Sequence, residues 1–496
     1  MDPSYKSRKE AFVSNLAGGS VLEINTVTLV APASVFLWSV LQSRLSFFTP
    51  YGPAALITDF LLNVLGILFA TTIYSSAPLL LNILLISPAL LVLLNSRHRR
   101  TQQRAKPPHT VTAQHGPNTP KALPIHPFLT TYRAAMMIIT CIAILAVDFH
   151  VFPRRFAKAE NWGTSLMDLG VGSFVFSGGV VSARALVKDE GSGAPSKKTL
   201  VQRFASSMRH SIPLLVLGLI RLYSVKNLEY AEHVTEYGVH WNFFFTLGFL
   251  PPFMEIFEGL AKLIPSYEVL SLAVAALYQV ALESSDLKSY ILVSPRGPSL
   301  LSKNREGVFS FLGYLAIFLA GRATGLRIMS RGPAAMTPQQ AKKRVLTSLG
   351  AQTLGCTALF ALNSMYFFGY GANIPVSRRL ANMPYVLWVA AFNNAQLFLF
   401  CLIEAVFFPP GNRTPAVGTD GEAERTAFAT SRILKAFNRG GLPVFLAANL
   451  LTGAVNLTVP TLDVNNVQAM AILIGYAAVI TGIALGLDKA NIKLSL

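Results

Sequence analysis

Charged residues are scarce in this sequence of 496 residues. Only 13% of the chain is Asp, Glu, Lys or Arg, whereas about 25% is usual for a soluble domain, and 52% is hydrophobic. So little charge cannot cover one water-soluble core of this size. The composition excludes an ordinary soluble enzyme and predicts membrane-spanning helices, because a helix satisfies its own backbone polar groups in lipid.

Cysteine is also scarce, with three residues in the whole chain. Cys141, Cys356 and Cys401 each lie inside an apolar run, where a thiol behaves as a small hydrophobic group. No CxxC pair or Cys/His cluster has the spacing of metal ligands. We therefore expect no disulfide framework, no metal site and no covalent acyl-enzyme on cysteine.

Acidic residues are outnumbered, with 24 Asp and Glu against 42 Lys and Arg, so the formal net charge is +18. In a soluble protein this excess would suggest nucleic acid as a partner. Here the basic residues lie in short loops between apolar runs, which is an orientation signal in membrane proteins. No basic amphipathic stripe or aromatic platform accompanies them, so no nucleic-acid partner is expected.

Long apolar runs, in contrast, are abundant. The sequence predicts an all-α polytopic integral membrane protein with about thirteen transmembrane helices, forming a single membrane domain over residues 1–496. The expected spans are 23–43, 55–75, 77–95, 131–149, 163–184, 207–224, 239–258, 267–284, 308–326, 347–369, 385–407, 441–460 and 467–487. The polar segments 97–128 and 411–437 are interpreted as flexible cytoplasmic linkers.

The basic loops predict the orientation of the spans. Segments 96–106, 188–203 and 327–344 are rich in Lys and Arg and fall on one side if all thirteen spans cross. The positive-inside rule makes that side cytoplasmic. The lumenal side then receives the N-terminus and five other segments, namely 150–162, 225–238, 285–307, 370–384 and 461–466.

One lumenal segment holds many charges just after an apolar run. The stretch "DFHVFPRRFAK" (148–158) contains Asp148, Lys158, and the arginines Arg154 and Arg155. The planar guanidinium groups of these two arginines suit a phosphate, so both are candidate substrate-binding residues. A carboxylate base, a cation for developing negative charge and a neighbouring apolar slot suit acyl transfer to an alcohol. The alternative is a basic flanking loop without chemistry.

The next span, "GTSLMDLGVGSFVFSGG", combines an ionisable group with small residues. Asp168 within a span is a functional candidate because a buried charge is costly in a membrane. Gly170, Val171, Gly172 and Phe174 are expected to line a channel for a fatty chain, since small residues allow close approach. The alternative is that the glycines only pack helices together.

Two further groups of polar residues are expected on the lumenal side. In "VKNLEYAEHVTEYGVHWNFF" (225–244), carboxylates and imidazoles suit a polyhydroxy head group better than zinc, because no HExxH is present. In "NREGVFSFLGY" and "PVSRRLANMPYVLW", arginines suit an anionic phospholipid. The candidate substrate-binding residues in these groups are Glu229, His233, Glu236, His240, Asn242, Arg305, Glu306 and Arg378.

The stretch "DFHVFPRRFAKAENWGTSLMDLGVGSFVFS" resembles the signature of the inositol acyltransferases of glycosylphosphatidylinositol (GPI)-anchor synthesis, the PIG-W family, in its fungal form. "GGSVLEIN", "KNLEYAEHVTEYGVHWNFF", "NREGVFSFLGY" and "SRRLANMPYVLW" resemble its other blocks in the same order, so that the likeness covers residues 18 to about 390. It implies a multi-pass endoplasmic reticulum protein of about thirteen spans. The implied activity is transfer of a fatty acyl group, usually palmitoyl, from acyl-coenzyme A to an inositol hydroxyl of glucosaminyl-phosphatidylinositol. Acyl-coenzyme A would be a co-substrate, with no bound cofactor and with membrane lipids around the protein.

The resemblance also implies roles for two residues. Asp148 and Lys158 match the likely catalytic pair of the family, with Asp148 taking the inositol proton and Lys158 orienting Asp148 and stabilising the oxyanion. His150 stands where relatives have proline, which argues against His150 as the base. Two other functions stay open on the sequence: a lipid transporter or scramblase with arginine-lined phospholipid sites, and a non-catalytic assembly subunit.

Overall fold

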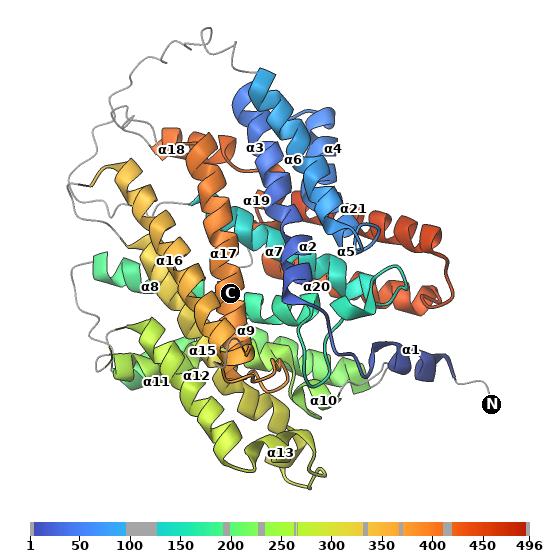
Figure 1. The fold of residues 1–496 in the computed structure, drawn as a ribbon, viewed down its shortest axis with the longest axis vertical. Helices are drawn as coiled ribbons and strands as arrows, with labels where there is room; N and C mark the ends of the chain where they lie inside the picture. The colour runs from blue at the N-terminus through green and yellow to red at the C-terminus, as the bar shows by residue number, and fades with distance from the viewer. Residues whose placement is uncertain are drawn as a thin grey trace.

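The structure is a computed structural model. It describes the chain apart from residues 1–3, 96–125, 192–198, 227–233, 262–263, 265, 331–335, 367–370, 410–418 and 493–496. The described part is built from helices, with isolated bridges between Gly18–Gly19 and Thr164 and no strand (Figure 1). The prediction of an all-α polytopic membrane protein is confirmed.

The helices follow the apolar runs of the sequence. Their bounds are α1 Tyr5–Val13, α2 Val21–Thr28, α3 Val30–Leu45, α4 Pro53–Phe60, α5 Gly66–Thr71, α6 Pro78–Asn95, α7 Pro127–Ala146, α8 Leu166–Gly191, α9 Leu200–Lys226, α10 Val234–Tyr237, α11 Phe243–Ala261, α12 Tyr267–Ser284, α13 Leu287–Leu292, α14 Leu300–Lys303, α15 Arg305–Met329, α16 Pro338–Ser364, α17 Met383–Phe407, α18 Thr419–Phe428, α19 Arg432–Arg439, α20 Gly441–Thr458 and α21 Asn466–Lys489. A π-helix at Leu61–Leu65 joins α4 to α5, and a 3₁₀ turn at Arg154–Phe156 lies between α7 and α8.

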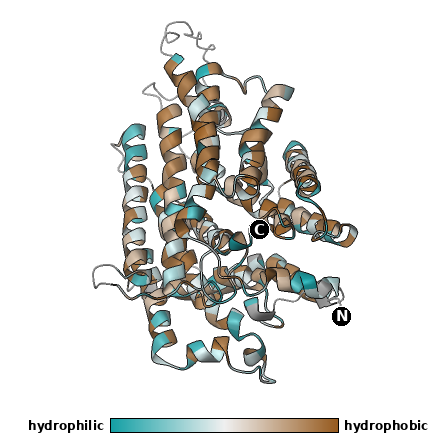
Figure 2. Cartoon of the chain, turned by 45° about the vertical axis from the view of Figure 1, so that its right-hand side comes forward, coloured by the Kyte–Doolittle hydropathy of each residue, from teal (hydrophilic) through white to brown (hydrophobic). Residues whose placement is uncertain are grey.

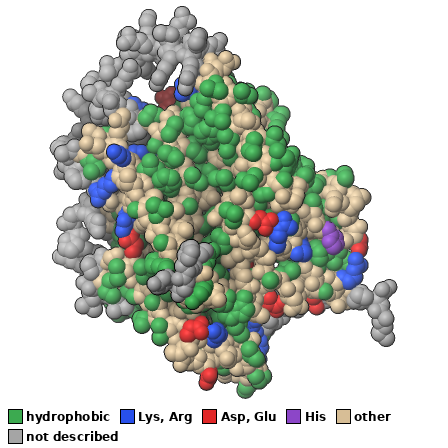
Figure 3. Space-filling view, viewed as in Figure 1, with side chains coloured by type: hydrophobic (Ala, Val, Ile, Leu, Met, Phe, Trp, Pro, Cys, Tyr) green, Lys and Arg blue, Asp and Glu red, His purple; other side chains and the backbone are tan. Residues whose placement is uncertain are grey.

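Ten helical segments among the described residues are long and apolar enough to cross a membrane. Hydrophobic residues dominate the long helices in Figure 2, and hydrophobic side chains cover much of the face shown in Figure 3, where charged side chains form a few separate groups. The expected count of thirteen is not confirmed. Helices α9, α11 and α12 do lie at the other three expected positions but are not among the ten, and α9 and α11 contain only shorter apolar segments, at Ser211–Tyr223 and Phe243–Phe257.

Helices α8 and α15 approach each other closely through glycine. A Cβ atom at Gly179 would lie 2.1 Å from the carbonyl oxygen of Phe318, and one at Gly321 would lie 2.1 Å from that of Phe176. No side chain fits at such distances, so the small residues let the two backbones pack directly. This contact anchors α8, which begins just beyond the charged segment 148–158.

The interpretation of 411–437 as a flexible linker is wrong for its second half. Residues 419–428 and 432–439 form α18 and α19, and Ile433, Leu434 and Phe437 of α19 are buried. The hydroxyl of Ser431 accepts from the Leu434 N–H and donates to the buried carboxylate of Asp59 at 2.7 Å, which ties α19 to α4. The first half of this segment, and nearly all of 97–128, lie outside the described residues; Pro127 and Phe128 already belong to α7.

The segments expected on the lumenal side do come together on one face of the bundle. We call this the loop face and define it as residues 5–20, 147–165, 234–243, 293–305, 371–382 and 456–465. Backbone bonds join its parts: Glu160 N to Leu16 O at 2.9 Å, and Gly163 N to Val376 O at 2.9 Å. The short helices α10 and α13 lie at the bottom of Figure 1, with α18 at the top.

Labelling of introduced cysteines tests the orientation. Ser289 on α13 and Lys343 on α16 are both exposed. In intact microsomes we expect Lys343→Cys to react with a membrane-impermeant maleimide from outside, and Ser289→Cys to react only after the lumen is opened. The background carries Cys356→Ala, since Cys141 and Cys401 are buried. Reaction of both from outside would contradict the orientation.

Candidate active site

The loop between α7 and α8 is held in one shape by Arg154. Its guanidinium donates to the carbonyl oxygens of Val147, Phe149 and Phe152 at 2.8, 3.2 and 2.8 Å, and it lies over the ring of Phe12 at 3.8 Å. The side chains of Phe149, Phe152 and Phe156 are fully buried beneath the loop. Arg154 was expected to bind substrate, but its donors here close the loop that carries Asp148.

Asp148 has one occupied and one open carboxylate oxygen. Its Oδ2 accepts from Asn456 Nδ2 at 2.7 Å, and among the described residues its Oδ1 has no hydrogen-bond partner. Burial raises the pKa of this carboxyl, against the opposing effects of the Asn456 bond and of the charges of Lys9 and Arg154. A partly buried carboxylate with a raised pKa and a free oxygen is suited to accept a proton.

Lys158 belongs to a chain of four charges. Its Nζ lies 2.6 Å from Glu236 Oε1, the same oxygen accepts from Arg378 Nη1 at 3.1 Å, and Arg378 Nε lies 2.6 Å from Asp168 Oδ1. The other oxygen of Asp168 accepts from the Ala159 N–H at 3.0 Å. Two cations thus balance two carboxylates, and the chain ends at the Lys158 ammonium, which is 37% exposed.

Arg378 is the buried centre of this chain. Burial alone would lower the pKa of its guanidinium, but Glu236 and Asp168 raise that pKa well above its usual value. The Tyr385 hydroxyl also donates to the Asp168 carbonyl oxygen at 2.7 Å, so α17 and α8 are joined at the same point. Asp168, Glu236 and Arg378, all expected from sequence to bind substrate, therefore bind one another and hold Lys158.

The contact implied by the expected orienting role of Lys158 is absent from the described part of the chain. Asp148 is bonded to Asn456, and Lys158 to Glu236. The two candidate catalytic residues lie on one loop but are positioned by separate groups. Their relative position is therefore set by the backbone of the loop and not by a direct contact between them.

A second cluster surrounds the fully buried carboxylate of Glu306. Arg296 lies 2.6 Å and Arg379 3.1 Å from its Oε1, and the Nε of Arg305 lies 3.8 Å from the same oxygen. Arg379 also donates to Asn161 Oδ1 at 2.6 Å. The three guanidinium groups share this carboxylate, and the charge of Glu160 also acts on Arg379. Guanidinium groups gathered at a membrane border suit an anionic group.

The other expected substrate-binding residues are placed as follows. Arg155 pairs with Glu23 of α2 at 2.6 Å. Asn242 caps the start of α11 by accepting from the Phe244 N–H at 3.0 Å, so its amide serves the fold. The backbone of His240 donates to Asn304 at 2.8 Å. Glu229 and His233 lie outside the described residues.

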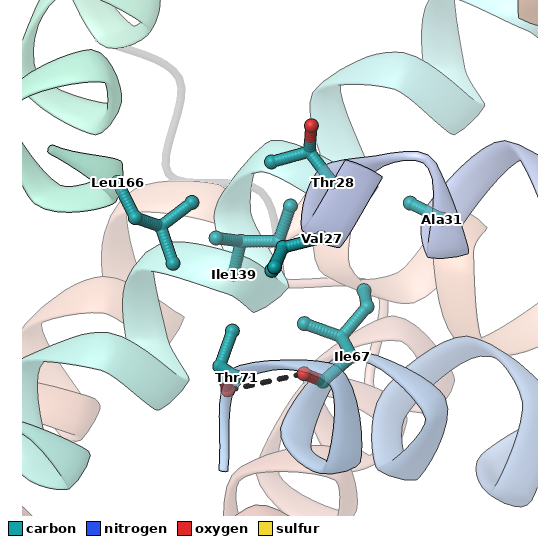
Figure 4. Close-up of a pocket in the computed structure, with 7 residues that line it drawn as sticks. All are labelled: Val27, Thr28, Ala31, Ile67, Thr71, Ile139 and Leu166. Carbon is teal, nitrogen blue, oxygen red and sulfur yellow. Dashed lines mark hydrogen bonds between the residues drawn. The ribbon is translucent and has the colours of Figure 1, made fainter. Parts of the chain in front are cut away.

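An apolar groove begins next to Asp168 on α8 and encloses about 440 Å³, a volume that includes space open to the outside. It is lined by Thr28, Ala31, Tyr132, Ala135, Met136, Ile139, Thr140, Leu166, Leu169, Gly170, Ser173, Phe392, Asn393, Gln396 and Phe400. A smaller cavity shares Thr28, Ala31, Ile139 and Leu166 with it and reaches Ile67 and Thr71 of α5 (Figure 4). Leu166 and Leu169 flank Asp168 on α8, so the groove begins on the turn that carries the charged chain.

The four expected channel residues divide between the groove and helix packing. Gly170 lines the groove. Gly172 instead faces α17, where a Cβ atom would lie 2.4 Å from Val389, and Val171 packs against the core. The ring of Phe174 contacts Phe243 and Phe445 at 6.3 and 5.6 Å between centroids. Of the four expected residues, only Gly170 lines the groove described here, and the expected lining by Val171, Gly172 and Phe174 stays a prediction. Val171 and Gly172 follow Gly170 directly in the helix and therefore point in other directions.

Sequence reasoning missed Asn456, Lys9 and Arg296. Asn456 is a neutral residue in the last turn of an apolar helix, and Lys9 and Arg296 look like ordinary flanking charges. No spacing rule connects positions so far apart in the chain. Within the described residues, no group of three or more His, Cys, Asp or Glu side chains could hold a metal ion.

A model of the GWT1 family matches residues 5–487 of the chain. The chain is 79% identical to "GPI-anchored wall transfer protein 1" of Emericella nidulans over 497 residues, covering all of both chains. It is 73% identical to the protein of that name from Aspergillus oryzae over 504 residues and 40% identical to that from Candida albicans over 513 residues, again covering all of both chains.

Removing the buried guanidinium tests the charged chain. Arg378→Ala leaves Asp168 without its buried partner, so we expect a loss of about 3–5 kcal/mol in the free energy of unfolding. Lys288→Ala removes the exposed pair with Glu283, at 2.8 Å, and should cost about 1 kcal/mol or less. Denaturant unfolding in detergent micelles measures both. Equal losses would show that the Arg378 pairs are not energetically coupled to the fold.

Proposed function

Because the chain belongs to the GWT1 family, we propose that it transfers a fatty acyl group from acyl-coenzyme A to an inositol hydroxyl of glucosaminyl-phosphatidylinositol. The chain is a multi-pass membrane protein of a family that takes part in GPI-anchor biosynthesis. The observation that carries the finer proposal is the open Oδ1 of Asp148 on the same loop as the Lys158 ammonium. An apolar groove that begins at Leu166 and Leu169, next to Asp168 on α8, supports it.

In the proposed reaction, Asp148 Oδ1 accepts the proton of the inositol hydroxyl as its oxygen attacks the thioester carbonyl. The new C–O bond forms an anionic tetrahedral intermediate, which the Lys158 ammonium stabilises. The C–S bond then breaks, and the coenzyme A thiolate leaves and takes the proton from Asp148. The products are the acylated inositol and free coenzyme A, and no covalent acyl-enzyme is required.

Two neighbouring features support the proposal for further parts of the substrates. The groove is apolar along α7, α8 and α17 and is suited to the fatty chain, palmitoyl by family resemblance. The guanidinium groups of Arg296, Arg305 and Arg379 around Glu306 have the planar geometry that suits the phosphate of the acceptor lipid. We place the reaction in the endoplasmic reticulum membrane, with the loop face toward the lumen.

Substituting the two candidate catalytic residues tests the mechanism. Asp148→Ala and Lys158→Ala should each lower kcat about 10²–10⁴-fold in transfer of labelled palmitoyl from its coenzyme A thioester. The double variant should be little worse than either single one, since both act in one step. Lys288→Ala, which removes an exposed charge of α13, serves as the control. Full activity of either single variant would refute its assignment.

Filling the groove tests the site of the fatty chain. A Cβ atom at Gly170 meets only Thr140 Oγ1, at 3.9 Å, so a larger side chain enters open space. We expect Gly170→Leu to lose palmitoyl transfer about tenfold or more while keeping transfer of a short chain such as octanoyl. Gly178→Leu is the matched control on the same helix, because Gly178 is exposed and a Cβ atom there meets Phe318 at an ordinary 3.4 Å. Equal loss at every chain length would contradict the assignment.

A further inference from the structure

Asp148 is held by a residue from the opposite end of the sequence. Asn456 lies in the last turn of α20, and its Nδ2 donates to Asp148 Oδ2 at 2.7 Å and to the Thr452 carbonyl oxygen at 3.1 Å. Helix α20 is fixed beside α7 just below this point, since the Tyr476 hydroxyl of α21 bonds to the Cys141 carbonyl oxygen at 2.8 Å and lies 3.2 Å from the Thr452 hydroxyl. The amide therefore reaches Asp148 from a rigid support.

A cation fixes which way that amide points. Lys9 Nζ of α1 donates to Asn456 Oδ1 at 2.6 Å. An amide turned by 180° would present its oxygen to the Asp148 carboxylate and its NH₂ to the ammonium, and both contacts would be repulsive. With Lys9 in place, only the orientation that donates to Asp148 is satisfied at both ends.

Helix α1 is itself anchored to the loop face. Arg8 pairs with Asp463 at 2.6 Å, and the Leu462 N–H donates to the Tyr5 hydroxyl at 3.3 Å. One turn further along α1, the ring of Phe12 contacts that of His150 at 4.6 Å between centroids. Contacts before and after Lys9 in the sequence therefore place it over Asn456.

We propose that Asn456 and Lys9 are positioning residues for Asp148. Lys9 orients the Asn456 amide, the amide holds Oδ2, and Oδ1 is thereby left to face the acceptor hydroxyl. This inference rests on the proposed function, in which Asp148 is the base. It adds the N-terminal helix and α20 to a site otherwise built from the loop between α7 and α8.

The groups that face Asp148 determine in which direction its pKa, and with it the activity at low pH, should change. Among the described residues they are Lys9 from α1, Asn456 from α20, Tyr476 from α21, and Arg154 from its own loop. As a base, Asp148 must be ionised, so activity falls as the pH drops below its pKa. The Asn456 bond and the charge of Lys9 lower that pKa, and losing either raises it.

The test is the pH profile of kcat/KM for acyl transfer by the full-length protein. For Asn456→Ala we expect the acid limb to move up by about one pH unit, with activity returning to within about threefold of wild type above that limb. Lys9→Met should move the limb in the same direction by less, and Asn456→Asp by more, since it adds a second carboxylate. A purely structural role would lower activity equally at every pH.

Two variants serve as matched controls. Asn449→Ala removes an amide of the same helix that, among the described residues, bonds to the Phe445 carbonyl oxygen alone, at 2.8 Å. Glu10→Gln removes an exposed charge of α1 next to Lys9. Both should keep the wild-type profile. If Asn456→Ala does not fold, the acid limb of Lys9→Met, a variant of the peripheral helix α1, still tests the proposal. An unshifted limb in a folded Asn456→Ala or Lys9→Met protein, with Asp148→Ala inactive, would overturn this proposal alone, whereas an active Asp148→Ala would overturn the assignment of the base.

Discussion

The buried guanidinium of Arg378 is the interaction on which the arrangement of the loop face depends. It lies between the carboxylates of Asp168 on α8 and Glu236 on α10, and Glu236 in turn holds Lys158. Charges buried this deeply are stable only together, because each desolvated member requires its partners. Arg378 joins α8, α10 and the loop that carries Lys158. These three elements must therefore assemble as one unit before Lys158 has a defined position.

Hydropathy was sufficient to predict most of the fold, and the places where it failed have physical causes. The long apolar runs became helices because the backbone in lipid has no other way to satisfy its polar groups. The segment 411–437 was misread because its buried residues, Ile433, Leu434 and Phe437, are interleaved with Arg432, Lys435 and Arg439. Such a short amphipathic helix is polar on average and apolar only on the face that meets its neighbours.

The candidate site was only partly predictable from the sequence. The charged residues of the loop face could be identified as candidates from the sequence, since an ionisable group next to a membrane span is costly and therefore indicates a function. Their partners could not, because Asp168 and Arg378 are 210 positions apart, and no local rule states which carboxylate meets which cation. Arg154 and Asn242 were expected to touch substrate and instead bond to the backbone, which an isolated sequence cannot distinguish from ligand binding.

The same contacts separate residues that hold the site from residues that are left to act. Asp168 uses both oxygens and Arg378 bridges two carboxylates, so neither offers a free group to a ligand without breaking a buried pair. Asp148 retains an open oxygen, and the ammonium of Lys158 stays more than one-third exposed at the end of its chain. Proton transfer and oxyanion stabilisation both require a group that still has a free hydrogen-bonding position at the reacting atom. Asp148 and Lys158 meet this requirement, because their neighbours hold them in place and leave such a position free.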